Sequence, residues 1–282
     1  MDGFNGGWDP SFPIVMHFVG SDSVGAKSWK ILESHPDYDA AKNHEDLEAA
    51  KRLVTHFLDT PENSAKLETL KQKFPSSIIV SIHAVEAKGK NYIPQILADY
   101  IGKLTGLEVD DNIIQTNRVH RTGTDEWHRF AFRPTFGGDV KAGHSYILVD
   151  DVFSLGGSFN ELRRFIEFHR GKVVQAIAMA TGRSGPEIAL NPNTLKNLID
   201  RYGKDKLHSF LKEIDLYAGD CQALTEPEAR ALRRAPSLDE ARNRILAARQ
   251  AVLPSVGPES LQESEAAKIR PQKTYPKHGF HR

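Results

Sequence analysis

The stretch Ile147-Leu148-Val149-Asp150-Asp151-Val152-Phe153-Ser154-Leu155-Gly156-Gly157-Ser158 decides the fold. Its apolar start, from Tyr146 to Val149, is typical of a strand covered on both faces, and the two acids are predicted to end that strand. A small-residue turn then opens into an amphipathic helix, and a second apolar run follows at 173–180. A strand–helix–strand passage of this kind indicates a parallel pair with a right-handed crossover. The sequence therefore predicts an α/β fold with a partly parallel sheet flanked by helices.

The same stretch predicts a ligand site, because ligands of open α/β folds bind at the carboxyl edge of the sheet. Glycines at 156 and 157 let backbone N–H groups approach an anion, and the helix N-terminus adds partial positive charge. Two carboxylates beside them suit sugar hydroxyls or a hydrated Mg²⁺. Together these groups fit a phosphorylated ribose. The alternative is that Ser158-x-x-Glu161 is only a capping box and that the acids merely end a strand.

On these residues the chain resembles the type I phosphoribosyltransferases, whose phosphoribosyl-pyrophosphate (PRPP) motif is an apolar strand, two acids and a Thr/Gly-rich loop. The order of elements is most similar to the ComF-type members. The resemblance covers about 75–185 and implies a core with N- and C-terminal helical extensions. The expected regions are 1–74 (N-terminal accessory, mostly helical), 75–185 (core), 186–252 (C-terminal helical extension) and 253–282 (flexible tail).

The resemblance implies roles for individual residues. Asp150 and Asp151 would bind the ribose hydroxyls either directly or through Mg²⁺, which they would contact directly or by way of a water molecule. Both acids are therefore predicted as catalytic residues and as metal-binding residues. The 5′-phosphate loop would consist of Ser154, Leu155, Gly156, Gly157 and Ser158, and the pyrophosphate loop would include His83, Ala84 and Lys88. In the polar stretch 117–129, which matches the mobile loop of the family, Arg118, Arg121 and Arg129 are candidates to contact pyrophosphate. Residues 181–183 would lie near the acceptor base.

The implied activity is Mg²⁺-dependent transfer of a phosphoribosyl group from PRPP, the co-substrate, to a nitrogenous base or nucleotide-like acceptor. Two positions depart from the family pattern: Leu155 replaces a Thr donor, and Ser154 stands where purine-salvage members carry an acid. The alternatives are a non-catalytic PRPP- or nucleotide-sensing regulator, and a nucleotide-consuming effector of a stress or conflict system.

The segments around the motif predict further elements. A strand is expected within 76–82, a helix marked by Ile93 to Leu104 with Gly106 as its C-cap, and a strand over 130–136. Trp127 and Phe130 could stack a base or anchor a loop. Helices are also expected at 61–73, 192–202 and 204–214, and capping boxes at Thr225-x-x-Glu228 and Ser237-x-x-Glu240.

Composition limits the remaining classes. The 282 residues carry 37 Lys+Arg and 37 Asp+Glu, and this balance argues against binding nucleic acid by bulk charge, although the basic tail leaves weak binding open. The single cysteine excludes an intrachain disulfide. With no transmembrane run and no secretory pattern at the N-terminus, a cytoplasmic protein without membrane partners is expected. The expected partners are small molecules, and a homodimer is compatible with the sequence.

Overall fold

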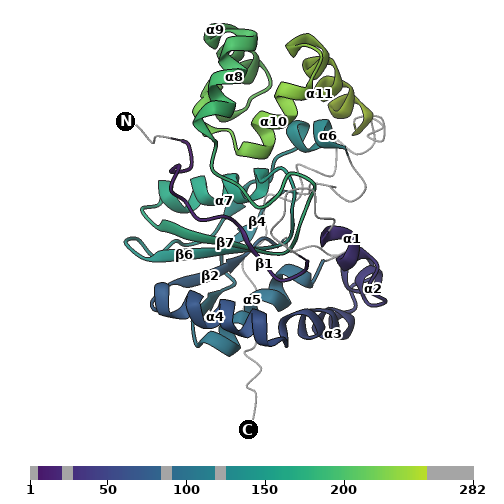
Figure 1. Ribbon diagram of the computed structural model, residues 1–282, viewed down its shortest axis with the longest axis vertical. Coiled ribbons are helices and arrows are strands. Elements are labelled where there is room, and N and C mark those ends of the chain that lie inside the picture. The colour runs from purple at the N-terminus through teal and green to yellow at the C-terminus, as the bar shows by residue number, and fades with distance from the viewer. Residues whose placement is uncertain (1–5, 21–27, 84–90, 118–124, 253–282) are drawn as a thin grey trace, which may run out of the picture.

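A computed structural model describes residues 6–20, 28–83, 91–117 and 125–252 (Figure 1). Its centre is a five-stranded, wholly parallel sheet, which confirms the predicted α/β class. In spatial order the strands are β1 (Met16–His17), β7 (Lys172–Thr181), β6 (Ser145–Phe153), β2 (Ile78–Ser81) and β3 (Glu108–Asp110). The N-terminal region therefore contributes an edge strand to the same sheet as the motif strand.

One face of the sheet is covered by the N-terminal helices and α5, drawn below the sheet in Figure 1. These helices are α1 (Ser28–Glu33), α2 (Tyr38–Asn43), α3 (Leu47–Leu58), α4 (Pro61–Lys73) and α5 (Ile93–Thr105). The predicted helix at 61–73 is confirmed, with Thr60 as its N-cap and proline at its first position. Gly106 caps α5 in the left-handed conformation, as predicted. Alternate strand residues, including Ile79, Ile147 and Ile177, face this layer.

The opposite face packs against α7 (Gly157–Phe168) and a small two-stranded antiparallel sheet. This second sheet pairs β4 (Ile114–Gln115) with β5 (Phe136–Gly137). Ile78, Val80, Tyr146 and Leu148 point to this side and meet Phe159 and other apolar residues of α7. Neighbouring strand residues thus serve opposite cores, as the alternation of side chains along a strand requires.

A third group of helices forms its own core beyond α7, at the top of Figure 1. It contains α8 (Pro192–Tyr202), α9 (Lys204–Glu213), α10 (Glu226–Arg234), α11 (Leu238–Val252) and the short α6 (Glu126–Ala131), with 3-10 turns at Tyr217–Gly219 and Cys221–Ala223. The capping box at Thr225 is confirmed. Ser237 Oγ accepts from Glu240 N at 3.0 Å. We call this group the C-terminal cap.

Two predicted details are wrong. The strand expected over 130–136 is short and starts at Phe136, because Asp125 N-caps helix α6 and Trp127 and Phe130 are buried in the C-terminal cap. Asp150 and Asp151 do not end the motif strand, since pairing with β7 continues to Phe153. The alternative interpretation, in which Ser158 caps α7, is also wrong, because the left-handed Gly156 holds the N-cap position.

Among the described residues, no helix is both long enough and apolar enough to cross a membrane. The predicted site residues Ala84, Lys88, Arg118 and Arg121, together with the tail at 253–282, lie outside the described residues.

Candidate functional site

The two acids lie where the sheet narrows. Strand β2 ends at Ser81, opposite Val149, and Ile82 N donates the next hydrogen bond to Val149 O at 2.8 Å. Beyond that point β6 continues with β7 alone on the pairs Asp150–Ala178 and Phe153–Thr181. Both carboxylates therefore leave the sheet at its carboxyl edge, the edge at which ligands of such folds bind.

Among the described residues, three donors from three parts of the chain hold Asp151. Its Oδ2 accepts from Lys42 Nζ at 2.8 Å and from Asn91 Nδ2 at 2.9 Å, and its Oδ1 accepts from Val152 N at 2.6 Å. Lys42 belongs to α2, and Asn91 lies just before α5, where its Oδ1 also accepts from Ile93 N. The carboxylate is therefore fixed in orientation before any ligand arrives.

The pair of Lys42 and Asp151 is charged at neutral pH. Burial alone would raise the pKa of Asp151, but the Lys42 ammonium and the hydrogen bonds from Lys42 and Asn91 bring that pKa below its usual value. Burial opposes the charge on Lys42 as well, while Asp151 and Tyr38 raise the pKa of the ammonium above its usual value. Each partner therefore stabilises the ionised form of the other.

Arg129 brings a second cation to the acids from α6. Its Nη1 donates to Ser154 Oγ at 2.5 Å, which ties the helix to the predicted phosphate loop. Burial lowers the pKa of Arg129, whereas the charges of Asp151 and Asp150 act in the opposite direction. Of the three arginines predicted to contact pyrophosphate, Arg129 is the one within the described residues, and it lies beside the acids.

The predicted phosphate loop runs directly from β6 into α7. Gly156 adopts a φ of +79° at the N-cap, and Gly157 and Ser158 form the first turn of the helix. Leu155 packs into the core of the C-terminal cap. An apolar contact thus stands where a hydroxyl donor was expected. Its carbonyl accepts from Thr225 Oγ1 at 2.5 Å. The C-terminal cap therefore holds the predicted phosphate loop through the side chain and the carbonyl of Leu155.

Substitution of Gly156 by alanine is expected to lower the free energy of unfolding by about 1–3 kcal/mol, since a left-handed conformation is costly for any residue with a Cβ. That Cβ would also lie 2.9 Å from the Phe153 ring and 3.1 Å from Thr225 Cγ2. Gly143 has the same φ of +79° but open space around its Cβ position, so Gly143→Ala is the matched control. Urea unfolding should show the larger loss at Gly156; equal losses would refute the close packing of Thr225 on the loop.

A buried ionic cluster supports the first turn of α7. Arg133 donates to Glu161 at 3.1 Å and to Glu228 at 2.5 Å, and it also donates to the hydroxyl of Tyr217. A Cβ on Gly157 would lie 2.1 Å from Arg133 Nη1, so this glycine leaves room for the guanidinium. Because both carboxylates neutralise Arg133, the cluster is structural and links the core to the C-terminal cap.

The neighbouring strand ends carry the other predicted residues. His83 is buried just after β2, with Nδ1 2.9 Å from Ser81 Oγ. At the end of β7, Thr181 N donates to Ser28 Oγ at 2.9 Å, and Ser28 Oγ donates to Thr181 O at 2.8 Å. These bonds attach α1 to the site. Arg183, at the predicted acceptor position, is exposed.

The arrangement of Asp151 does not fit a direct Mg²⁺ ligand. Both of its oxygens already accept hydrogen bonds, and an ammonium lies against Oδ2. Mg²⁺ requires oxygen ligands at about 2.0–2.1 Å and is repelled by an adjacent cation. Within the described residues, no group of three or more His, Cys, Asp and Glu side chains could hold a metal. The metal role of Asp150 and Asp151 therefore stays a prediction, and the geometry of Asp151 favours sugar hydroxyls as its partners.

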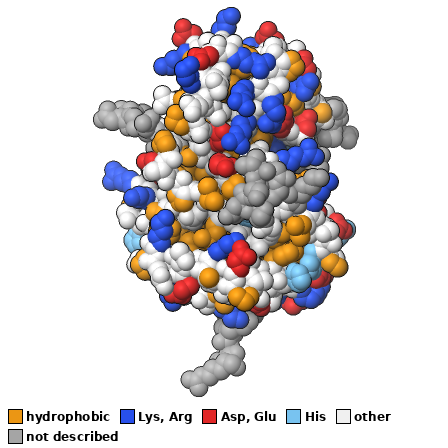
Figure 2. Space-filling view, viewed as in Figure 1, with side chains coloured by type: hydrophobic (Ala, Val, Ile, Leu, Met, Phe, Trp, Pro, Cys, Tyr) orange, Lys and Arg blue, Asp and Glu red, His pale blue; other side chains and the backbone are white. Residues whose placement is uncertain are grey.

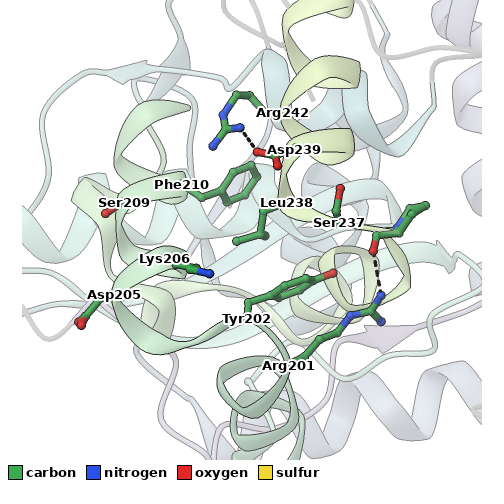
Figure 3. Close-up of a pocket in the computed structure, with 11 residues that line it drawn as sticks. Arg201, Tyr202, Asp205, Lys206, Ser209, Phe210, Ser237, Leu238, Asp239 and Arg242 are labelled. Carbon is green, nitrogen blue, oxygen red and sulfur yellow. Dashed lines mark hydrogen bonds and ion pairs between the residues drawn. The ribbon is translucent and has the colours of Figure 1, made fainter.

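A separate pocket lies between helices of the C-terminal cap (Figure 3). Its volume is about 680 Å³, and its lining includes the cations Arg201, Lys206 and Arg242. Arg201 donates to backbone carbonyls, including Ala235 O at 2.8 Å, and Arg242 pairs with Asp239 and Glu213. Figure 2 shows that Lys and Arg side chains gather at this end of the molecule, with scattered acidic ones between them. Two of these three cations, Arg201 and Arg242, therefore already have partners within the described residues.

Sequence reasoning missed Lys42, Asn91 and Tyr38. Lys42 lies 109 positions before Asp151, in a region predicted to be an accessory layer, and its helix has only six residues. The available local signal was weak: Tyr38 and Lys42 are spaced i, i+4, so they share one helix face. Nothing local indicated that this face meets the carboxyl edge of the sheet.

Comparisons with known proteins give relatives in bacteria and a set of solved structures. No family model matches the chain. The chain is 40% identical over 226 residues to protein TraN of Escherichia coli, a match that covers 80% of this chain and 49% of TraN. It is 33% identical over 162 residues to an uncharacterized protein of Haemophilus influenzae, covering 56% of this chain and 33% of that protein.

The similar structures include adenine phosphoribosyltransferase of Saccharomyces cerevisiae, with a TM-score of 0.30 and 15% identity over 49% of this chain and 72% of that one. Purine phosphoribosyltransferase of Pyrococcus horikoshii gives a TM-score of 0.29 and 16% identity over 50% of this chain and 76% of that one. In sequence, the chain spans about half the length of TraN and a third of the Haemophilus protein, so its relatives are longer chains of which it matches one part.

Proposed function

We propose that the protein is a phosphoribosyltransferase that takes PRPP as donor, transfers the phosphoribosyl group to a nitrogenous base or nucleotide-like acceptor and releases pyrophosphate. One observation carries this proposal: β6 delivers two carboxylates to the sheet edge, and the next residues form a glycine loop at the N-terminus of α7. On this proposal, the carboxylates that bind the diol and the loop that binds the phosphate follow one another on one continuous segment.

The surrounding residues support a division of roles. The carboxylates of Asp150 and Asp151 would accept hydrogen bonds from the ribose hydroxyls, and the backbone N–H groups of Gly156 and Gly157 would donate to the 5′-phosphate. Arg129, which donates to Ser154 in the predicted phosphate loop, would stabilise the negative charge that grows on departing pyrophosphate. The helices α1, α2 and α6 all bring residues to this edge, so they would limit the access of water to the reacting carbon.

Displacement at C1 of PRPP needs no covalent nucleophile from the protein. The bond from C1 to the pyrophosphate oxygen breaks and the bonding pair leaves with pyrophosphate. The acceptor nitrogen supplies the electron pair of the new bond to C1, and a proton carried by the acceptor base is released to solvent. The predicted Mg²⁺ would accompany the pyrophosphate end as part of the substrate, and none of the residue roles above passes through it. Ser154 is bonded to Arg129, so we assign it no role as a base.

A regulator that binds PRPP without turnover is the second candidate. The burial of Leu155 in the C-terminal cap favours it, because the side chain that would supply a hydroxyl to phosphate instead couples the loop to another group of helices. A ligand on the loop would therefore be sensed directly by the cap.

The test combines binding with turnover. Calorimetric titration with PRPP and Mg²⁺ should show saturable binding, and release of pyrophosphate should appear with at least one member of a panel of purine and pyrimidine bases. Binding without release would favour the regulator, whereas the absence of binding would contradict both candidates.

A further inference from the structure

We propose that Lys42 is the resident cation of the diol site and that it makes binding of the ribose 5-phosphate end independent of divalent metal. The inference rests on the proposed function, and it assigns a specificity-determining residue to the N-terminal helices. It starts from the mismatch between Asp151 and Mg²⁺: the position beside the carboxylate that a metal would take is already filled by an ammonium.

The position of the ammonium is built from several contacts. Lys42 Nζ donates to Asp151 Oδ2 and to the Tyr38 hydroxyl, each at 2.8 Å, and it lies 5.2 Å from the centre of the Tyr38 ring. The side chains of Lys42 and Asp151 are only 16% and 11% exposed. A flexible surface lysine would lack this second partner and this burial.

The helix that carries Lys42 is itself anchored. Ala41 is completely buried, and Tyr38 is buried in the core shared by α3, α5 and the sheet. Asp37, just before the helix, pairs with Arg52 of α3 at 2.5 Å. These contacts fix the position of α2 without the ion pair, so the helix places Lys42 beside Asp151.

Two chemical consequences follow from this arrangement. A divalent ion and an ammonium on the same carboxylate repel each other, so Asp151 keeps Lys42 in place of Mg²⁺. An ammonium also has three N–H donors, and those of Lys42 have two partners among the described residues. The third N–H can donate a hydrogen bond to an oxygen of the ligand. A metal ion bound in the same place would coordinate that oxygen instead.

The experiment uses ribose 5-phosphate, which has the diol and the phosphate but lacks the pyrophosphate that chelates Mg²⁺. For the unchanged protein, calorimetric Kd values in EDTA and in Mg²⁺ should agree within about twofold. Lys42→Met should weaken binding in EDTA by about tenfold or more, the loss expected for one charge-assisted hydrogen bond and a disturbed carboxylate. Lys42→Arg, which keeps the charge, should recover part of the affinity.

Lys51→Met is the matched control, since Lys51 lies on α3, is 50% exposed and pairs only with Glu48 among the described residues. It should bind ribose 5-phosphate as the unchanged protein does. The titration of the unchanged protein still tests the independence from divalent metal even if the Lys42 variants fail to fold. Loss of ribose 5-phosphate binding in EDTA, or a Lys42→Met variant that is folded and binds normally, would overturn the inference. If PRPP itself fails to bind in Mg²⁺, the proposed function fails instead.

Discussion

Asp151→Asn is expected to weaken PRPP binding by about 100-fold or more, which is equivalent to about 3 kcal/mol and to one or two charge-assisted hydrogen bonds. Asparagine keeps the size of the side chain, but it has one acceptor oxygen and no charge. It would also leave the Lys42 ammonium, 2.8 Å from Oδ2 in the present structure, without its counter-ion. Calorimetry with PRPP and Mg²⁺ measures the change, and Asp150→Asn with Asp151→Asn should abolish binding altogether.

Two further variants separate lost binding from lost folding. Lys42→Met with Asp151→Asn removes both charges of the buried pair, so it should unfold at higher urea concentration than Asp151→Asn alone, yet still fail to bind PRPP. Asp200→Asn is the exposed control on α8, where the carboxylate is 57% exposed and pairs with Lys196. An Asp151→Asn variant that is folded and binds PRPP within about threefold of the unchanged protein would disprove the role of Asp151.

The segment from β6 to β7 was predictable because its signals are local. A continuous apolar run, a glycine turn and an amphipathic helix each report on neighbouring residues, and the parallel pairing follows from the length of the crossover. The helix starts at Thr60 and Thr225 were predictable for the same reason, since a cap involves only residues three positions apart.

The errors arise where distant parts of the chain decide the local structure. Phe130 has β propensity, but its burial among helices of the C-terminal cap favours α6. The acids were expected to end their strand because charged residues avoid a buried sheet. Asp151 stays in β6 with partners from distant segments, because Lys42 and Asn91 both donate to its carboxylate. Arg129, from a further segment, donates to Ser154 at the end of the same stretch.

Leu155 shows how the same position can be interpreted in two ways. In sequence it is a missing hydroxyl donor beside the phosphate loop. In the structure it is an apolar contact that joins this loop to the C-terminal cap, and the loop carbonyl is bonded to Thr225 in the same region. The difference between Leu155 and the motif that the sequence resembles therefore has a physical explanation in the helices that follow the sheet.

The link between loop and cap also predicts the largest effect on stability, at Glu228. This carboxylate is fully buried and accepts from Arg133 at 2.5 Å, from Tyr217 at 3.0 Å and from Thr225 N at 2.9 Å. Glu228→Ala should lower the free energy of unfolding by about 3–5 kcal/mol, the loss typical when one partner of a buried ion pair is removed. Urea unfolding measures this loss.

The comparison with Glu228→Gln and Glu240→Ala tests the cause. Glutamine retains an oxygen that can accept the hydrogen bond from Thr225 N. Glu228→Gln therefore measures the loss of the charge beside Arg133 while the hydrogen bond at the N-terminus of α10 is kept. Glu240, which is 42% exposed and pairs with Arg244 on α11, should cost less than about 1 kcal/mol when replaced by alanine. A loss at Glu228 no larger than the loss at Glu240 would mean that Glu161 alone neutralises Arg133. The expected large loss would instead show that Glu228 of the C-terminal cap supplies the charge that holds Arg133 beside the first turn of α7, which follows the predicted phosphate loop.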